Sequence, residues 1–137
     1  MKLYFDRKET PFVFEIKNES GSTALVDATP KIGGKNKGLT PMQLLAGSLA
    51  GCMSIDVISI LNKQKIDPSH FSIEIQAMKK EGLPSPFEHI ALIFKVSNEV
   101  PREKLEKAIL LSKEKYCSVY FSLNKEISVT HSIEIQS

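Results

Sequence analysis

The sequence predicts an α+β fold, on the order of its expected elements and on one long apolar helix. Three short β-like segments come first, followed by a helix, two strands, two helical segments and a last strand. Strands and helices alternate in a parallel α/β fold, and they do not alternate here. The 137 residues contain no repeat and no linker, so we expect a single domain over residues 1–137.

The N-terminal third predicts an antiparallel meander. Residues 2–5, 11–17 and 22–27 are short runs rich in β-branched and aromatic side chains, separated by turn signals. Residues 28–38 (ATPKIGGKNKG) are then expected to form a solvated surface loop, because glycines and lysines interrupt any periodic pattern. The spacing GxxxxGK[ST] of a phosphate-binding loop is absent.

A long helix is predicted from Thr40 to about residue 64. Thr40 fits the N-cap, Pro41 fits the first helical position, and Gln43 completes a capping box. The residues that follow (LLAGSLAGCMSIDVISILNK) are apolar on nearly all sides, so we expect the helix to be buried on more than one face.

This helix is not expected to span a membrane. It contains Asp56, and an aspartate near the bilayer centre costs about 3 kcal/mol on insertion scales. Its small residues instead predict close packing against another helix, through Ala46, Gly47, Ala50 and Gly51. One small sheet gives such a helix too little cover, which favours a homodimer whose partners share helices and strands.

The C-terminal half predicts two strands, a helix and a closing strand. Residues 70–79 and 89–96 alternate between apolar and polar side chains and read as a hairpin. Residues 101–116 carry an apolar stripe at helical spacing, formed by Leu105, Ala108, Ile109 and Ser112. Cys117 follows at or just after the end of this helix. Residues 127–135 form the last strand, and His131 on its inward face is expected to be a satisfied core histidine rather than a catalyst.

Composition and charge exclude several classes of function. The net charge of +2 is too small to indicate nucleic acid, and no export signal precedes the first strand, so we expect a cytoplasmic protein. Two cysteines in a reducing compartment do not form a disulfide framework. The cysteines and the three histidines show no short ligand spacing, so we expect neither a metal nor a cofactor.

Two cysteine-bearing segments resemble a known family. The first-cysteine helix of the OsmC/Ohr superfamily is similar to TPMQLL (40–45) together with AGC (50–52). Its second-cysteine segment is similar to EKYCSV (114–119), and the two cysteines lie 65 positions apart, as in the family. Ser54-x-Asp56-Val57 further resembles the YhfA-type branch. The resemblance covers nearly the whole chain.

The resemblance implies an intertwined homodimer with two long central helices, a stress-response role, and active sites at the subunit interface. In characterised members the first cysteine attacks a hydroperoxide and becomes a sulfenic acid. The second cysteine resolves it to a disulfide, which a dithiol reduces. By position, Cys52 is then the peroxidatic and Cys117 the resolving cysteine of a thiol-dependent oxidoreductase. Its expected substrate is a small hydrophobic hydroperoxide, favoured by Leu45, Leu49 and Met53 around Cys52.

The chain departs from the peroxidase pattern at two places. Met42 stands where those enzymes have a glutamate, and the meander has no arginine in residues 18–37, the only arginines being Arg7 and Arg102. These departures favour an alternative function: a non-enzymatic dimer that binds a small apolar ligand and keeps its cysteines for structure.

The local sequence does little to activate Cys52. The residue lies far from the helix N-terminus, and Asp56 one turn later disfavours a thiolate. Arg7, Lys37 and Arg102 are the candidate sources of an activating cation. Cys117 has Lys113 one turn before it and lies close to the start of a further short helix, so we expect it to be at least as acidic as Cys52.

Overall fold

The computed structural model describes residues 1–137 and contains the predicted elements in the predicted order. They are β1 (Leu3–Glu9), β2 (Val13–Asn18), β3 (Thr23–Val26), α1 (Pro41–Lys63), β4 (Phe71–Lys79), β5 (Phe87–Ser97), α2 (Arg102–Leu111), α3 (Ser118–Ser122) and β6 (Ser128–Gln136), with a 3₁₀ turn at Pro30–Ile32 and a π turn, η2, at Ser112–Tyr116. The α+β class is confirmed. The chain divides into two compact units, Met1–Leu45 and Ala46–Ser137, and the assignment of all 137 residues to one domain stays a prediction.

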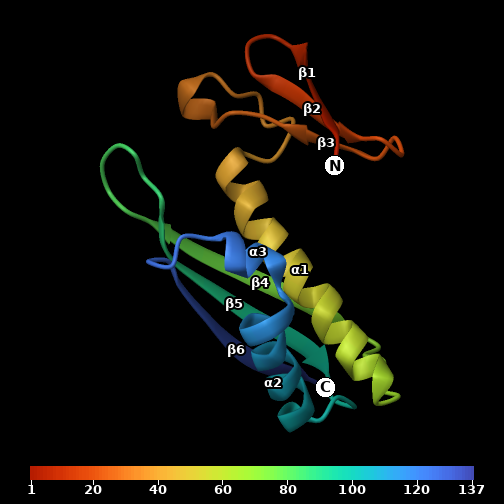
Figure 1. Cartoon of the computed structure of the whole chain (residues 1–137). Coiled ribbons are helices and arrows are strands. Elements are labelled where there is room, and N and C mark those ends of the chain that lie inside the picture. Colours follow the sequence, from red (N-terminus) through yellow and green to blue (C-terminus); the bar gives the residue numbers. More distant parts are fainter. The chain divides into compact units, whose positions relative to one another are not determined.

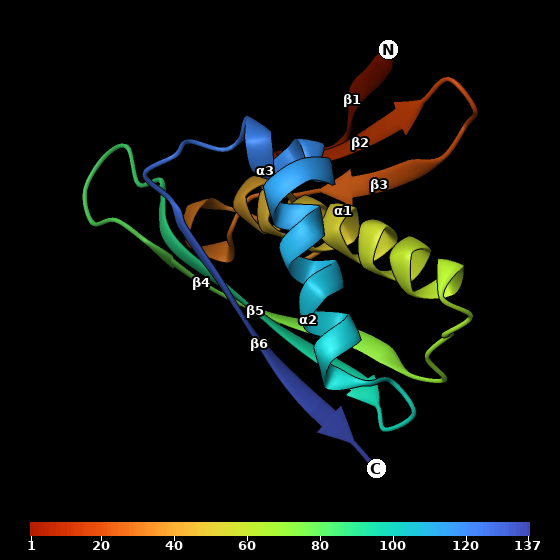
Figure 2. The same ribbon diagram turned by 60° about the horizontal axis from the view of Figure 1, so that its bottom comes forward.

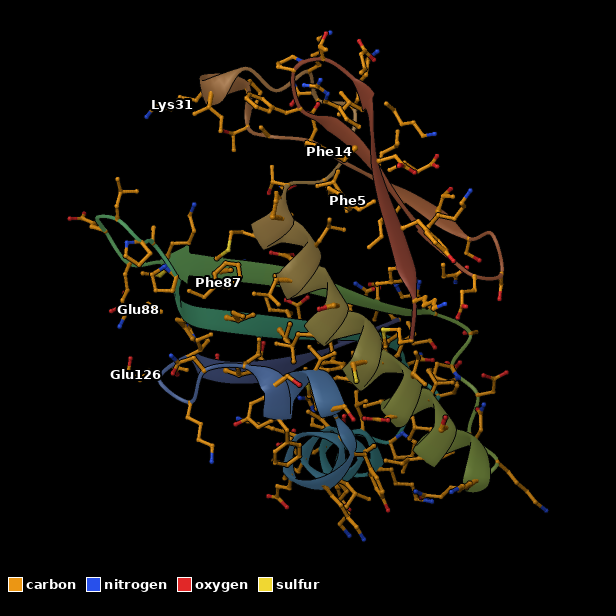
Figure 3. The ribbon with its side chains drawn as sticks, turned by 45° about the horizontal axis from the view of Figure 1, so that its top comes forward. Phe5, Phe14, Lys31, Phe87, Glu88 and Glu126 are labelled. Carbon is orange, nitrogen blue, oxygen red and sulfur yellow. The ribbon has the colours of Figure 1, made fainter.

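The first unit contains the predicted meander. Strands β1, β2 and β3 pair antiparallel in that order. Phe5 on β1 and Phe14 on β2, both labelled in Figure 3, stack on each other. Their ring centroids lie 5.0 Å apart. This cross-strand aromatic pair stabilises the register of β1 on β2.

The loop after β3 is held by two carboxylates. Asp27 is buried and accepts the backbone N–H groups of Ala28, Lys35 and Lys37, and these hydrogen bonds lower its pKa. Glu9 pairs with the ammonium groups of Lys35 and Lys37, which lowers the pKa of Glu9 to about 2. The lysines that keep the loop polar are therefore tied to Glu9.

Helix α1 starts as its sequence predicts. The Thr40 N–H donates to Oε1 of Gln43 at 2.9 Å, and the Gln43 N–H donates to Oγ1 of Thr40 at 3.3 Å, which is a reciprocal capping box. Pro41 occupies the first helical position.

The second unit packs helices against a three-stranded sheet. Figures 1 and 2 show α1 and α2 on the same face of the sheet formed by β4, β5 and β6. β4 and β5 form the expected antiparallel hairpin, whereas β6 pairs parallel to β5, with Ile90 opposite Val129. A parallel pair needs a crossover, and the segment from α2 to α3 supplies it. The core comes from α1 (Ala46, Leu49, Ala50, Met53, Val57, Leu61), β5 (Ile90, Leu92, Phe94, Val96) and α2 (Leu105, Ala108, Ile109).

The burial of α1 within one chain is less complete than the sequence predicts. Ala46 and Ala50 are buried, but Gly47 and Gly51 face open space, and Ile55 is 70% exposed. The helix has the length and hydropathy of a membrane span, yet its buried residues recur every three or four positions, as expected for one face packed on a core. A second apolar face of α1 therefore stays open in the single chain.

Candidate functional site

The two cysteines meet although they lie far apart in the sequence. Cys52 is on the middle turns of α1 and is partly exposed, whereas Cys117 directly follows η2 and is fully buried. Their Sγ atoms and a carboxylate oxygen of Asp56 all lie within 4.8 Å of one another. The structure therefore joins both predicted site residues and adds a carboxylate to them.

A π turn and a helix cap position Cys117. The five residues of η2 widen the end of α2, and the Cys117 N–H closes the turn on the carbonyl of Ser112 at 2.8 Å. Cys117 is then the N-cap of α3, where its sulfur accepts the N–H of Tyr120 at 3.3 Å. The start of a short helix at this residue was expected from the sequence. Single π turns inside helical segments occur often at functional sites.

A buried hydrogen bond connects the two cysteine-bearing segments. The hydroxyl of Ser112, which is 0% exposed, donates to Oδ2 of Asp56 at 2.7 Å. Sequence reasoning placed Ser112 on the inward stripe of its helix and gave it no role. The sequence did contain a signal for this contact, because a polar residue such as Ser112 on a buried helix stripe needs a hydrogen-bond partner.

The surroundings of Cys117 disfavour its thiolate. Burial raises the pKa of Cys117 to about 11, and the nearby Cys52 and the charge of Asp56 act in the same direction. The hydrogen bond from the Tyr120 N–H lowers the pKa, but by less than burial raises it. The start of α3 was expected to favour the thiolate of Cys117, but desolvation of the thiolate outweighs this helix cap.

Lys113, expected near Cys117, and Arg102, a candidate cation for Cys52, make their contacts elsewhere. Lys113 donates to the carbonyl of Val129 at 2.7 Å and lies over the Tyr120 ring. Arg102 donates to the carbonyl of Ile133. None of the ion pairs of the chain involves Asp56. The second unit therefore gives the thiol pair and its carboxylate no ion-pairing partner.

His131 is a satisfied histidine, as its sequence context predicts. Its Nε2 atom lies 2.8 Å from a carboxylate oxygen of Glu106 on α2. The contact joins β6 to α2, and it pairs His131 with Glu106 rather than with the two cysteines.

A cleft of about 380 Å³ opens beside Asp56. It is lined by Asp56, Ser59, Ile60, Lys63, Gln64, Leu111 and Tyr116. Leu49 and Met53 were expected to surround a substrate at Cys52, but both are packed into the core, with 0% and 1% exposure. Apolar contact with a small molecule is therefore available from Ile60, Leu111 and Tyr116 instead.

Comparison with protein families gives one match. Residues 34–132 match the OsmC family, described as "OsmC-like protein". The curated protein YhfA of Escherichia coli K12 is 33% identical to this chain over 120 residues, which is 87% of each protein. The YhfA protein of Shigella flexneri matches equally well.

Solved structures share the fold over almost the whole chain. A hypothetical protein from Aquifex aeolicus is 25% identical, with a TM-score of 0.79 over 99% of this chain and 97% of its own. The organic hydroperoxide resistance protein OsmC from Legionella pneumophila has a TM-score of 0.71 at 16% identity, over 98% of this chain and 97% of its own. OhrB of Bacillus subtilis, also an organic hydroperoxide resistance protein, has a TM-score of 0.67 at 16% identity, with 98% of each chain covered.

The raised pKa of Cys117 predicts slow alkylation in the Cys52→Ser variant. Burial is the largest cause of the raised pKa of Cys117 and remains in this variant, so only a small fraction of Cys117 should be a thiolate at pH 8. The rate of reaction with iodoacetamide should rise steeply only above pH 9. Adding Asp56→Asn should shift the profile to lower pH, because a negative charge beside the thiolate is removed. A profile with its midpoint below pH 8.5 in the single variant would contradict the buried, carboxylate-facing position of Cys117.

Proposed function

Because the chain belongs to the OsmC family, we propose that it is a thiol-dependent oxidoreductase that reduces organic hydroperoxides through Cys52 and Cys117. The observation that carries the proposal is the meeting of the two sulfurs within 4.8 Å of each other. The two fold relatives named as organic hydroperoxide resistance proteins support the substrate class.

The different exposure of the two cysteines supports a different role for each. Cys52 is partly exposed and faces incoming substrate, so its thiolate attacks the terminal oxygen of the hydroperoxide. The O–O bond breaks, Cys52 becomes a sulfenic acid, and the alkoxide leaves as an alcohol after it takes a proton. Cys117 is fully buried, so a peroxide in solution does not reach it directly. A buried thiol that reacts only with the sulfenic acid of Cys52 fits the resolving role.

The second step closes a disulfide between neighbouring sulfurs. The Cys117 sulfur attacks the Cys52 sulfur of the sulfenic acid, and water leaves. A disulfide bond is about 2.0 Å long, so the two sulfurs have to approach from a separation of at most 4.8 Å. An external dithiol then reduces the bond, is itself oxidised to a disulfide, and returns two thiols.

The surroundings of the thiol pair differ from the pattern that the peroxidases of the family use. The chain has Met42 at the position of the expected glutamate and no arginine in its meander. The charge of Asp56 and the burial of Cys117 both oppose thiolate formation at Cys117. This electrostatic setting favours the second candidate function, a dimer that binds a small apolar ligand and keeps its thiols inert.

Peroxide treatment separates the two functions. We expect cumene hydroperoxide to consume both thiols of the reduced protein and to form a Cys52–Cys117 disulfide, measured by thiol titration and non-reducing peptide mapping. Cys117→Ser should stop at a sulfenic acid on Cys52, and Cys52→Ser should not react, because its remaining thiol is buried. Unchanged thiols after treatment with both cumene hydroperoxide and hydrogen peroxide would remove the peroxidase function. An apolar ligand retained in native mass spectrometry would then support the binding function.

The cleft beside Asp56 predicts the preference for an organic hydroperoxide. Leu111 lines the cleft, and Leu110 does not, although both are 38% exposed on the same helix. We expect Leu111→Ala to slow the reaction with cumene hydroperoxide about fivefold, for a loss of about 1 kcal/mol of apolar contact. The rate with hydrogen peroxide should stay unchanged, and Leu110→Ala should alter neither rate. Equal effects of the two alanine variants would show that the organic group binds elsewhere.

The open face of α1 supports a homodimer. Gly47 and Gly51 leave room for a backbone to approach closely, and Ile55 beside them is 70% exposed. We expect light scattering to give twice the 15.3 kDa of one chain, and Ile55→Glu to give monomers, because a charge replaces an apolar contact. Leu83→Glu, at a fully exposed loop residue, is the matched control and should stay dimeric. A monomeric wild-type protein would refute the dimer.

A further inference from the structure

We propose that Cys52, Asp56 and Cys117 together bind one thiophilic divalent cation, of which Zn²⁺ and Cd²⁺ are the representatives. The site is distinct in chemistry from the peroxide reaction, because no electrons are transferred. It uses both sulfurs as ligands rather than as a redox pair.

The donor atoms have the spacing of a compact metal site. The two Sγ atoms and the Asp56 oxygen all lie within 4.8 Å of one another. In a tetrahedral zinc site, with Zn–S bonds of about 2.3 Å, two sulfur ligands lie about 3.8 Å apart. The three donors therefore need to draw in by about 1 Å or less, which side-chain rotation allows. Two sulfurs and one carboxylate are a soft donor set, which favours zinc and cadmium over magnesium and calcium.

The charge of the cluster calls for a cation. The two thiols and the carboxylate lie together, and no ion pair of the chain involves Asp56. Lys63 lines the neighbouring cleft without forming an ion pair. A thiol that coordinates a divalent ion loses its proton outright. Binding therefore releases the two thiol protons to solvent, and the M²⁺ ion is held by two thiolates and one carboxylate.

The residues around the donors hold them in place. Ser112, itself 0% exposed, donates to Oδ2 of Asp56, and the Tyr120 N–H donates to the sulfur of Cys117. Hydrogen bonds of this kind orient metal ligands, and their loss typically weakens binding by about 10- to 100-fold. The cleft that Asp56 lines gives solvent access to its carboxylate, and three protein ligands would leave the fourth tetrahedral position to water.

The metal site and the disulfide exclude each other. Sulfurs that are bound to zinc are not free to become a sulfenic acid or to close a disulfide. A cation at this site therefore protects both thiols from peroxide, and oxidation of the thiols releases the cation.

The test measures cation binding by the reduced full chain without any peroxide. We expect one Cd²⁺ per chain, with a sulfur-to-cadmium charge-transfer band in the ultraviolet, and displacement of Cd²⁺ by Zn²⁺. The band should be lost in Cys52→Ser and Cys117→Ser. Ser112→Ala should bind about 10- to 100-fold more weakly. Asp67→Asn, which changes an exposed carboxylate outside the cluster, should bind like the wild type. Absence of the band in the wild type, or its survival in either serine variant, would overturn the proposal.

A second measurement needs no variant and so does not depend on how the variants fold. Zn²⁺ should protect both cysteines of the wild-type chain from iodoacetamide, as mapped by mass spectrometry, and a chelator should restore their reaction. Alkylation of either cysteine at an unchanged rate with saturating Zn²⁺ would refute the site. A chain that forms the disulfide with peroxide and gives no cadmium band keeps the proposed function and refutes the metal site. A chain that gives the cadmium band but does not react with peroxide keeps the metal site and refutes the proposed function.

Discussion

The thiol pair depends on a hydrogen bond from the buried hydroxyl of Ser112 to the carboxylate of Asp56, 2.7 Å long. Helix α1 presents Cys52 and Asp56 one turn apart, so both lie on the same side of the helix. The hydrogen bond ties that side to the end of α2, and η2 then carries the chain directly to Cys117. Leaving the fully buried hydroxyl of Ser112 without a partner would cost about 1–3 kcal/mol, more than the bond itself contributes. The two segments are therefore held in one arrangement, with both sulfurs beside the carboxylate.

This arrangement has an electrostatic consequence. The carboxylate that connects the two segments also opposes a negative charge on Cys117, and burial acts in the same direction. The hydrogen bond from the Tyr120 N–H offsets only part of this effect. The site thus holds two close sulfurs, and the buried Cys117 stays protonated until something favours its thiolate. A peroxide that captures the small thiolate fraction and a cation that binds both sulfurs are two ways to do so.

Much of the fold could be predicted because its signals are local. The capping box of Thr40 and Gln43 and the first-turn Pro41 predicted the start of α1, and the structure contains both hydrogen bonds of the box. Alternation along residues 89–96 predicted which side chains of β5 are buried, and Ile90, Leu92, Phe94 and Val96 are fully buried on one face. These predictions succeed because a helix or a strand expresses its period in a few consecutive residues. The two cysteines were identified by their sequence resemblance to the OsmC family, in segments that are also short and local.

The sequence by itself determined the order of the elements, the buried faces of β5 and α2, and the two cysteines as candidates. Only the tertiary structure decided that β6 pairs parallel to β5, that Ser112 meets Asp56, and that Asp56 joins the two sulfurs. Periodicity states which face of an element is buried, but it does not state what that face contacts. The contact between Asp56 and Ser112 joins residues 56 positions apart, and it exists only after α1, α2 and the sheet have packed. The acidity of Cys117 was misjudged for the same reason, because its burial comes from that packing and not from its sequence neighbours.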